Sequence, residues 1–166
     1  MIDVRQLGNG EWKLYRSTRL AALQDAPYAF GSNKYEREIA FSEAKWKERA
    51  DQGAEGKESV CIIALDGDRG VGIAGGITPT DNPRVSKLVS MWVQEDYRGT
   101  DVASRLIAQI EVWSFDRGSE QIILGVSGGN DRAARFYEKM GFRPYDGKIA
   151  VGSVCEMFMQ KPLAVA

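Results

Sequence analysis

Residues 85–118 constrain the fold of this chain more than any other stretch. Val85–Val93 is rich in β-branched and apolar residues, which favours a buried strand. Gln94–Asp101 is charged or small and predicts a turn. Beyond it, apolar residues recur every three or four positions, as on the buried face of an amphipathic helix: Val102, Ala103, Leu106, Ile107, Ile110 and Trp113. The stretch therefore predicts a strand, a tight turn and a helix in direct succession.

The turn between this strand and helix has the features of an anion site. The first turn of a helix carries four backbone N–H groups without intrahelical partners, and the helix dipole adds partial positive charge there. Gly99 and Ala103 would let a phosphate approach the backbone, and Arg98 adds a planar, multi-donor cation. The same pattern also occurs in ordinary strand-to-helix turns that bind nothing, so both interpretations stay open at this point.

The absence of histidine restricts the chemistry that the chain can perform. It excludes Ser-His-Asp and Cys-His catalysis and every histidine-based metal site, and we expect no metal. Cys61 and Cys155 lie in apolar, strand-like surroundings, which favours two buried thiols over a disulfide. Catalysis would depend on carboxylates, Tyr, Ser, Lys, Arg, backbone amides and a bound cofactor.

Length and charge bound the class of protein. The 166 residues, 43% of them hydrophobic, predict one domain over residues 1–166 with a substantial core. A net charge of −1 argues against nucleic-acid binding. The chain has no apolar run of membrane-spanning length and no secretion signal at its N-terminus, so we expect no membrane association and a cytoplasmic protein.

The remaining patterns predict an α/β (α+β) fold. Helices are expected at Glu11–Asp25, from Asn33 or Ser42 to about Gln52, and at Arg132–Met140. Further strands are expected at Ile2–Leu7, Ser59–Leu65, Val71–Ile77, Gln121–Val126, Phe142–Tyr145 and Val151–Gln160. With the central strand and helix, this gives a mixed sheet of six to seven strands and about four helices.

A second informative stretch runs from Asn130 to Phe142. Tyr137 follows Asn130 by seven residues, about two helical turns, so both lie on one side of the predicted helix. Tyr137 is interpreted either as a functional residue or as a core tyrosine whose hydroxyl binds a carbonyl.

Together the two stretches resemble the GNAT superfamily of N-acetyltransferases. The acyl-CoA motif of that family, Arg/Gln-x-x-Gly-x-Gly/Ala, matches Arg98–Ala103, preceded on the strand by Met91–Val93. Its second motif matches Asn130, Ala133, Tyr137, Gly141 and Phe142. The resemblance covers roughly Ser59–Leu163.

The resemblance implies a fold in which the central strand splays away from the Gln121–Val126 strand and forms the acyl-CoA cleft. It implies acetyl-CoA as cofactor and transfer of its acetyl group to a primary amine of a small molecule or peptide, by direct attack in a ternary complex. Tyr137 would be the general acid, and a backbone N–H near Val93 would polarise the thioester carbonyl. The implied cofactor-binding residues are Met91, Trp92, Val93, Arg98, Gly99, Thr100, Asp101, Val102, Ala103, Ser104, Asn130, Ala133, Arg135 and Tyr137.

One residue departs from the family pattern. Asp101 stands where the family usually has glycine. An aspartate is favourable as a helix N-cap, but its carboxylate would repel a pyrophosphate and compete for the same N–H groups. Arg98 and Arg105 would offset that charge.

The acceptor side is less specific in the sequence. Tyr28, Phe30, Glu36 and Trp92 are the candidate substrate residues, with Trp46 as a further aromatic, although aromatic residues at such spacings are usually core. The general base is open among four carboxylates and a water chain; the carboxylates are Glu36, Glu38, Glu43 and Glu156. The resemblance also implies a homodimer.

Two other functions remain open. Asp101 is the feature that favours a CoA-binding or interaction module with weak or no transferase activity. A nucleotide-binding protein is disfavoured, because the chain has neither GxxxxGK[ST] nor GxGxxG after a strand.

Overall fold

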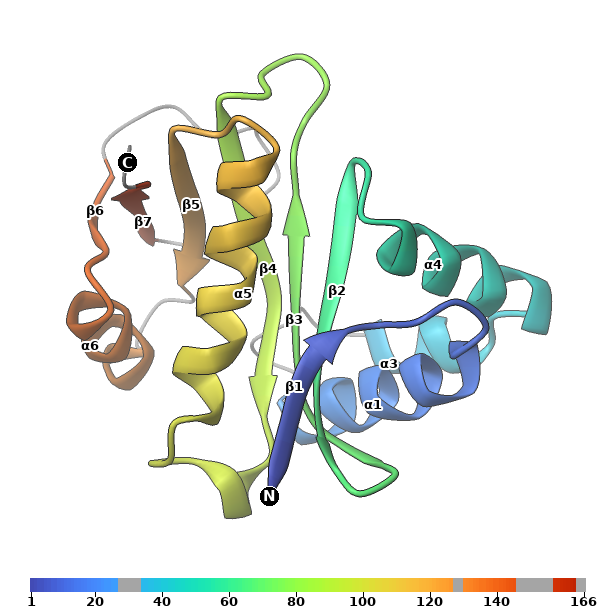
Figure 1. The fold of residues 1–166 in the computed structure, drawn as a ribbon. Coiled ribbons are helices and arrows are strands. Elements are labelled where there is room, and N and C mark those ends of the chain that lie inside the picture. The colour runs from blue at the N-terminus through green and yellow to red at the C-terminus, as the bar shows by residue number, and fades with distance from the viewer. Residues whose placement is uncertain (27–33, 127–129, 146–156, 164–166) are drawn as a thin grey trace.

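A single mixed sheet organises the molecule (Figure 1). The computed structural model describes residues 1–26, 34–126, 130–145 and 157–163. Within these residues seven strands lie in the order β1-β2-β3-β4-β5-β7-β6, and every neighbouring pair is antiparallel except β4 and β5. The strands are β1 (Ile2–Gln6), β2 (Ser59–Asp66), β3 (Arg69–Ile77), β4 (Val85–Val93), β5 (Gln121–Val126), β6 (Arg143–Pro144) and β7 (Met157–Pro162). The sheet confirms the expected mixed architecture, and the expected start of the last strand, at Val151, lies outside the described residues.

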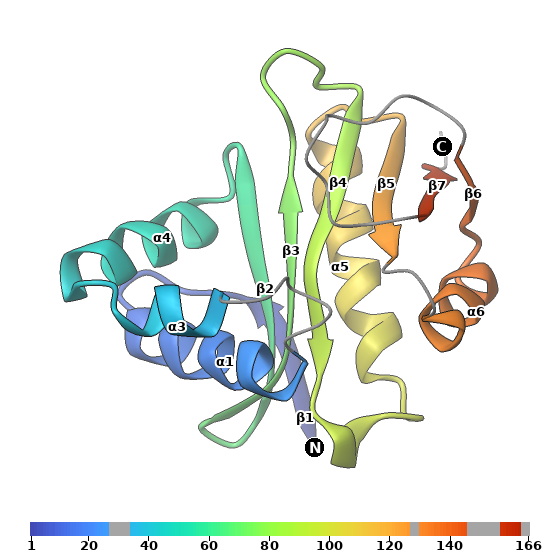
Figure 2. The same ribbon diagram turned by 180° about the vertical axis from the view of Figure 1, so that it is seen from behind.

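Helices cover both faces of the sheet (Figures 1 and 2). One face carries α5 (Val102–Asp116) and α6 (Asp131–Lys139), and the other carries α1 (Trp12–Asp25), α3 (Lys34–Ile39) and α4 (Glu43–Glu55). A short 3₁₀ helix, η1 (Glu95–Tyr97), connects β4 to the turn before α5. The helix expected up to about Gln52 is two helices, because Ser42 caps a new one by accepting a hydrogen bond from the Lys45 N–H.

Strand β2 shows how the two faces are filled. Its side chains alternate, so that Val60, Ile62 and Ala64 lie in the core under α5 while Cys61 and Ile63 lie in the core under α1 and α4. A strand covered on both faces reads as a continuous apolar run, and this explains why residues 59–65 lack a polar face.

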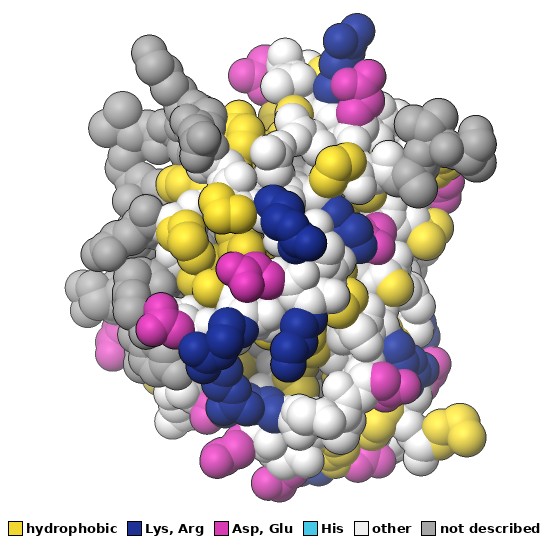
Figure 3. All heavy atoms as spheres, turned by 90° about the vertical axis from the view of Figure 1, so that its left-hand side faces the viewer, with side chains coloured by type: hydrophobic (Ala, Val, Ile, Leu, Met, Phe, Trp, Pro, Cys, Tyr) yellow, Lys and Arg dark blue, Asp and Glu magenta, His cyan; other side chains and the backbone are white. Residues whose placement is uncertain are grey.

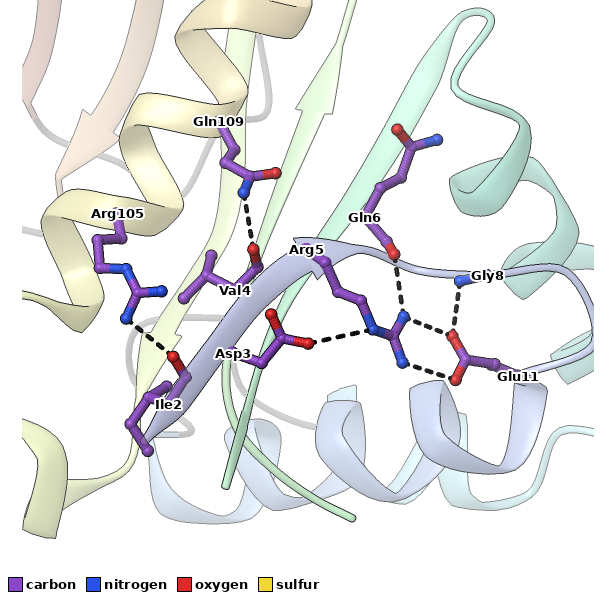
Figure 4. Close-up of polar contacts among 9 residues, drawn as sticks. All are labelled: Ile2, Asp3, Val4, Arg5, Gln6, Gly8, Glu11, Arg105 and Gln109. Atoms are coloured by element: carbon purple, nitrogen blue, oxygen red, sulfur yellow. Dashed lines mark hydrogen bonds and ion pairs between the residues drawn. The ribbon is translucent and has the colours of Figure 1, made fainter. Parts of the chain in front are cut away.

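A side chain of α5 and the residue just before α1 hold the edge strand β1 (Figure 4). Arg105 on α5 donates to the carbonyl of Ile2 at 3.0 Å. On the other side, Arg5 forms two hydrogen bonds with Glu11, at 2.7 and 2.9 Å. These bonds lower the pKa of the Glu11 carboxyl. Arg105 was expected to help offset the charge of Asp101, but its guanidinium donates to the N-terminal strand.

Strands β4 and β5 pair at one end and separate toward the other. Their parallel register covers only Val85–Lys87 against Gln121–Ile123, and within the described chain no pairing continues beyond it. At the paired end, the hydroxyl of Ser86 contacts those of Thr78, at 3.1 Å, and Ser119, at 2.5 Å. All three side chains are buried, so this network fastens the two strands where they meet. The other half of β4 therefore has an open edge on its β5 side.

Candidate active site

A β-bulge interrupts the open half of β4. Ile73 pairs with Trp92 and Gly75 pairs with Val89, so one β3 residue faces two residues of β4. Ser90, one of those two, has φ of 56°, a left-handed conformation that a serine rarely adopts. The bulge re-aims the following residues, and it places Ser90 and Met91 in the linings of two different cavities.

The first cavity, of about 420 Å³, lies between β4, the turn before α5, and α6. We call it the turn cavity. It brings together ten of the predicted cofactor-binding residues: Met91, Trp92, Val93, Arg98, Gly99, Thr100, Ala103, Asn130, Ala133 and Tyr137. The two sequence motifs, about 30 residues apart along the chain, therefore form one site. Among the other predicted residues, Val102 is buried in the core and Arg135 is exposed on α6.

The turn beside this cavity has backbone N–H groups that lack a partner among the described residues. Gly99 has φ of 77°, which explains why glycine is needed there. Within the described part of the chain, no acceptor is bound by the N–H groups of Gly99, Thr100, Asp101 and Ala103. Such a set of unpaired N–H groups at a helix start fits a phosphate.

Asp101 does not cap the helix, contrary to the sequence expectation. It occupies the N-cap position of α5, but its side chain forms no capping hydrogen bond and is exposed. Thr100 takes part of that role, because its hydroxyl lies 3.4 Å from the Val102 N–H and donates to the Tyr97 carbonyl. The Asp101 carboxylate therefore leaves the N–H groups of the turn accessible, and the Ser104 hydroxyl donates to the Asp101 carbonyl.

Arg98 lines the turn cavity but is held by protein partners. Its Nε donates to the carbonyl of Val93 at 3.0 Å, and its Nη2 donates to Asp25 at 2.8 Å. The same Asp25 oxygen accepts from the indole Nε1 of Trp92 at 2.9 Å. The side chain of Trp92 is thus buried on the α1 side, and Arg98 braces the turn against the end of α1.

Tyr137 lies on the wall of the turn cavity that α6 provides. Its ring packs edge-on against Phe136 and Phe142, with ring centroids 5.4 and 5.7 Å away. Burial raises the pKa of the Tyr137 hydroxyl above its ordinary value, so the group keeps its proton at neutral pH. Asn130 fixes the start of the same helix by accepting a hydrogen bond from the Ala133 N–H at 3.2 Å.

Basic side chains gather around α6. Figure 3 shows Lys and Arg side chains in the lower half of this side of the molecule, with Asp and Glu side chains among them. Arg132, Arg135 and Lys139 of α6 are exposed, and Arg132 lines the turn cavity. The sequence offered Arg132 or Arg135 as an arginine for the phosphate, and Arg132 is the one that lines the cavity.

The second cavity, of about 390 Å³, lies on the opposite face, between α1, α4 and strands β2–β4. We call it the arginine cavity. Buried Glu38 accepts two hydrogen bonds from Arg19, at 3.0 and 3.1 Å, and one from Arg49, at 2.9 Å. Arg19 also donates to the hydroxyl of Ser90 at the bulge, at 2.8 Å. The cluster thereby holds the strained residue of β4.

The candidate acceptor residues and bases are dispersed. Glu36 and Glu43 are exposed and line neither of these cavities. Glu38 is a poor base, because its two arginine partners lower its pKa despite its burial. Trp46 is a core residue, only 1% exposed. Tyr28, Phe30 and Glu156 lie outside the described residues.

Sequence reasoning missed several cavity residues. Tyr97 and Phe136 line the turn cavity, and each directly precedes a predicted site residue, a signal that could have found them. Arg19, Lys34 and Arg49 line the arginine cavity, and no local pattern connects them.

The described residues lack two features that would have suggested other functions. None of the described helices is both long and apolar enough to cross a membrane. The same residues contain no group of three or more acidic, cysteine or histidine side chains that could hold a metal ion.

Comparison with known proteins gives three kinds of match. The model of the acetyltransferase (GNAT) family matches residues 19–142. An acetyltransferase of Sodalis glossinidius is 37% identical over 60 residues, which are 36% of this chain and 42% of that protein. N-alpha-acetyltransferase 30 of Schizosaccharomyces pombe is 33% identical over 89 residues, 51% of this chain and 57% of that protein. The chain thus spans about half the length of these curated relatives.

Solved structures agree in fold. The PaiA N-acetyltransferase of Thermoplasma acidophilum, solved in complex with coenzyme A, superimposes with a TM-score of 0.75 over 98% of this chain and 99% of that one. The sequence identity is only 16%, so the likeness shows the fold. It confirms the expected arrangement of a mixed sheet with splayed central strands.

Proposed function

This chain belongs to the GNAT acetyltransferase family, and from that premise we propose that it transfers the acetyl group of acetyl-CoA to a primary amine of a small molecule or peptide. The observation that carries the proposal is the turn cavity. It joins an open strand edge, a helix start with unpaired N–H groups and a half-buried tyrosine in one space.

The residues of the turn cavity fit acetyl-CoA. The N–H groups of Gly99, Thr100, Asp101 and Ala103 would hold the pyrophosphate, and Arg132 would add positive charge. The open edge of β4 at Met91–Val93 would pair with the amides of the pantetheine arm, as an added strand does. Arg98 supports this site by bracing the turn, since Asp25 and the Val93 carbonyl hold its guanidinium.

Bound acetyl-CoA would supply a thioester, an acyl carbon open to attack by an amine and a thiolate leaving group. Backbone N–H groups near Val93 would donate to the acyl oxygen, where negative charge develops. Tyr137 would donate its proton to the departing sulfur and regain one as the attacking nitrogen, positively charged after attack, loses its surplus proton. Its raised pKa keeps that proton available through the neutral range, and its ring contacts with Phe136 and Phe142 hold the hydroxyl in place.

The acceptor would approach from the other side of β4. Ser90 lines the arginine cavity and the next residue, Met91, lines the turn cavity, so both spaces border β4 at the bulge. An amine must lose a proton before it attacks. Glu38 cannot take that proton at neutral pH, because Arg19 and Arg49 hold its carboxylate. Either water would accept the proton of the amine, or the amine would enter the site already unprotonated.

Ligand-dependent thermal unfolding tests the cofactor site first. CoA and acetyl-CoA should raise the melting temperature, whereas ATP should not, because a ligand of the native state stabilises it. Ala103→Glu would place a carboxylate in the turn and abolish the shift. Ala108→Glu, with the same change at an exposed site of the same helix, would leave it intact. No shift in the wild type would contradict the proposal.

Transfer itself is measured as thiol release with a panel of amines. Turnover with at least one amine, lost in Ala103→Glu, is the expected result. A shift with CoA but no transfer to any amine would favour the second candidate, a CoA-binding module, for which the exposed charge of Asp101 is the supporting observation. Sedimentation of the same samples would test the homodimer that the resemblance implies.

A further inference from the structure

The arginine cavity has an uneven charge balance. Three cationic side chains line it, from α1, the start of α3 and α4: Arg19, Lys34 and Arg49. The buried carboxylate in contact with them within the described chain is Glu38, which is shared between Arg19 and Arg49. The described groups around this space therefore carry about two more positive than negative charges.

Two of these cations have unused capacity. Arg49 commits one Nη atom to Glu38, and its guanidinium lies over the rings of Tyr15, Phe41 and Trp46. A guanidinium has five N–H donors, so several remain for a ligand. Lys34 is half-buried, and among the described residues its ammonium has neither an ion pair nor a hydrogen bond.

The pKa of Lys34 also indicates an excess of positive charge in the cavity. Burial lowers the pKa of Lys34, and the positive charges of Arg19, Arg37 and Arg49 lower it further, against the opposing effect of Glu38. Like charges gathered in a half-buried space are unfavourable. An anionic group in the cavity would relieve this repulsion.

The position of the cluster relates it to the reaction. Arg19 reaches the hydroxyl of Ser90 at 2.8 Å, and Ser90 adjoins the Met91 wall of the turn cavity. A ligand anion beside Arg49 and Lys34 would thus share the arginine cavity with Ser90 of the bulge, next to the β4 residues where the acyl group is expected. The cavity, of about 390 Å³, suits a small molecule.

We infer that the acceptor is a small amine that also carries an anionic oxygen group, a carboxylate or a phosphate, and that Lys34 and Arg49 bind this group in the arginine cavity. This inference rests on the proposed acetyl transfer and names the substrate class of that site. It also disfavours polycationic amines, because their charges would meet those of the cluster.

Anion binding to the CoA-saturated protein tests the inference. CoA fills the phosphate site of the turn, so inorganic phosphate and γ-aminobutyrate, each at constant ionic strength, can stabilise only through another site. We expect both to raise the melting temperature, and the amide of γ-aminobutyrate not to do so. The shift should vanish in the double variant Lys34→Gln/Arg49→Gln.

The matched control is Lys45→Gln/Lys47→Gln, which removes the same charge from exposed positions of α4. The control should keep the full shift, and Arg49→Lys alone should retain part of it. The melting temperatures without anion show whether each variant folds. Equal shifts in the wild type and the cavity double variant, or no anion-dependent shift in the wild type, would overturn the inference.

Acetylation rates with paired amines test the inference independently of anion binding. Acetylation of γ-aminobutyrate should exceed that of its amide and of putrescine by about tenfold in kcat/KM, and phosphoethanolamine should exceed ethanolamine similarly. The cavity double variant should raise KM for the anionic amines and bring each pair close to equality. A preference for putrescine would overturn the inference while leaving the proposed transfer intact. Failure of CoA itself to bind would instead contradict the proposed function.

Discussion

Nη2 of Arg98 donates to Oδ2 of Asp25 across 2.8 Å, and this contact fastens the turn before α5 to the C-terminal end of α1. The residues are 73 positions apart in sequence. The same carboxylate oxygen accepts from Trp92 Nε1, so one aspartate connects the helix, the central strand and the turn. The sequence motif assigns Arg98 to phosphate, but in the structure its guanidinium binds protein groups and supports the turn.

Asp25→Ala should lower the free energy of unfolding by about 1–2 kcal/mol, mainly because the Trp92 indole N–H loses its acceptor. For a domain of this size this means a fall in melting temperature of roughly 2–8 °C, measured by calorimetry. Asp25→Asn retains an acceptor for Trp92 and loses only the charge facing Arg98. Because that ion pair is 36–42% exposed, we expect the asparagine variant to lose under about 1 kcal/mol. Equal losses in both variants would refute this ranking.

Tyr137→Phe should reduce kcat by about 100-fold or more and leave the CoA dissociation constant within about twofold. Phenylalanine preserves the ring contacts with Phe136 and Phe142, so the melting temperature should change little. Because burial raises the pKa of Tyr137, the wild-type rate should rise with pH as the amine deprotonates and should not fall before about pH 10. An alkaline fall near pH 9 that disappears in Tyr137→Phe would contradict the assigned role.

Asp101→Asn should tighten CoA binding by about two- to fivefold at low ionic strength, and by less at high salt. The carboxylate forms no capping hydrogen bond. Its removal therefore takes a negative charge away from the phosphate site, and no backbone N–H loses a partner. Stability should fall slightly, by about 0.3–1 kcal/mol, because an acidic residue at a helix N-terminus is favourable. Asp116→Asn at the other end of α5 serves as the control and should leave CoA affinity unchanged, as titration calorimetry would show.

Cys61 should resist thiol reagents in the native protein. Burial raises the pKa of its thiol to about 12, so almost none is ionised at pH 8. In a Cys155→Ser background, a disulfide reagent at pH 8 should react with Cys61 only after unfolding.

The Cys61 thiol also makes the stability of the protein pH-dependent, because its pKa is raised in the folded state. The contribution of the protonated thiol to stability is complete below about pH 9. Above that pH, the free energy of unfolding should fall by about 1.4 kcal/mol per pH unit. Alkaline unfolding of Cys61→Ala should show a shallower slope.

Glu38→Gln should be among the most destabilising polar substitutions, at about 3–5 kcal/mol, because two arginines would lose a buried counter-charge. The folded pKa of Glu38 is lowered, so its contribution is present above the unfolded value near pH 4.3 and is lost as pH falls through the folded pKa. The gap in unfolding free energy between wild type and variant should therefore be full at pH 7 and narrow below about pH 4. Denaturant titrations at both pH values measure it, and a gap independent of pH would contradict the ion-pair explanation.

Local patterns were sufficient for the elements that carry the turn cavity. Alternation and helical periodicity report which faces are buried, so Val85–Val93, α5 and β2 could be predicted closely. The break between α3 and α4 at Ser42 was harder to predict, because the segment that separates the two helices is short and has no strong apolar periodicity. Asp101 was expected to cap α5 on propensity alone, whereas in the structure Thr100 lies closer to the first N–H groups.

The sequence by itself determined the strand, turn and helix order and the two motifs of the turn cavity, because those depend on residues close together along the chain. Only the tertiary structure decided that Arg98 binds Asp25, that the β4 bulge falls at Ser90, and that Arg19, Arg49 and Glu38 form one buried cluster. These relationships join residues of α1, α3 and α4 to one another, to the central strand and to the turn after it, and the paired residues are 11 to 73 positions apart in sequence. Their geometry follows from how helices pack on a twisted sheet, and no local periodicity encodes it.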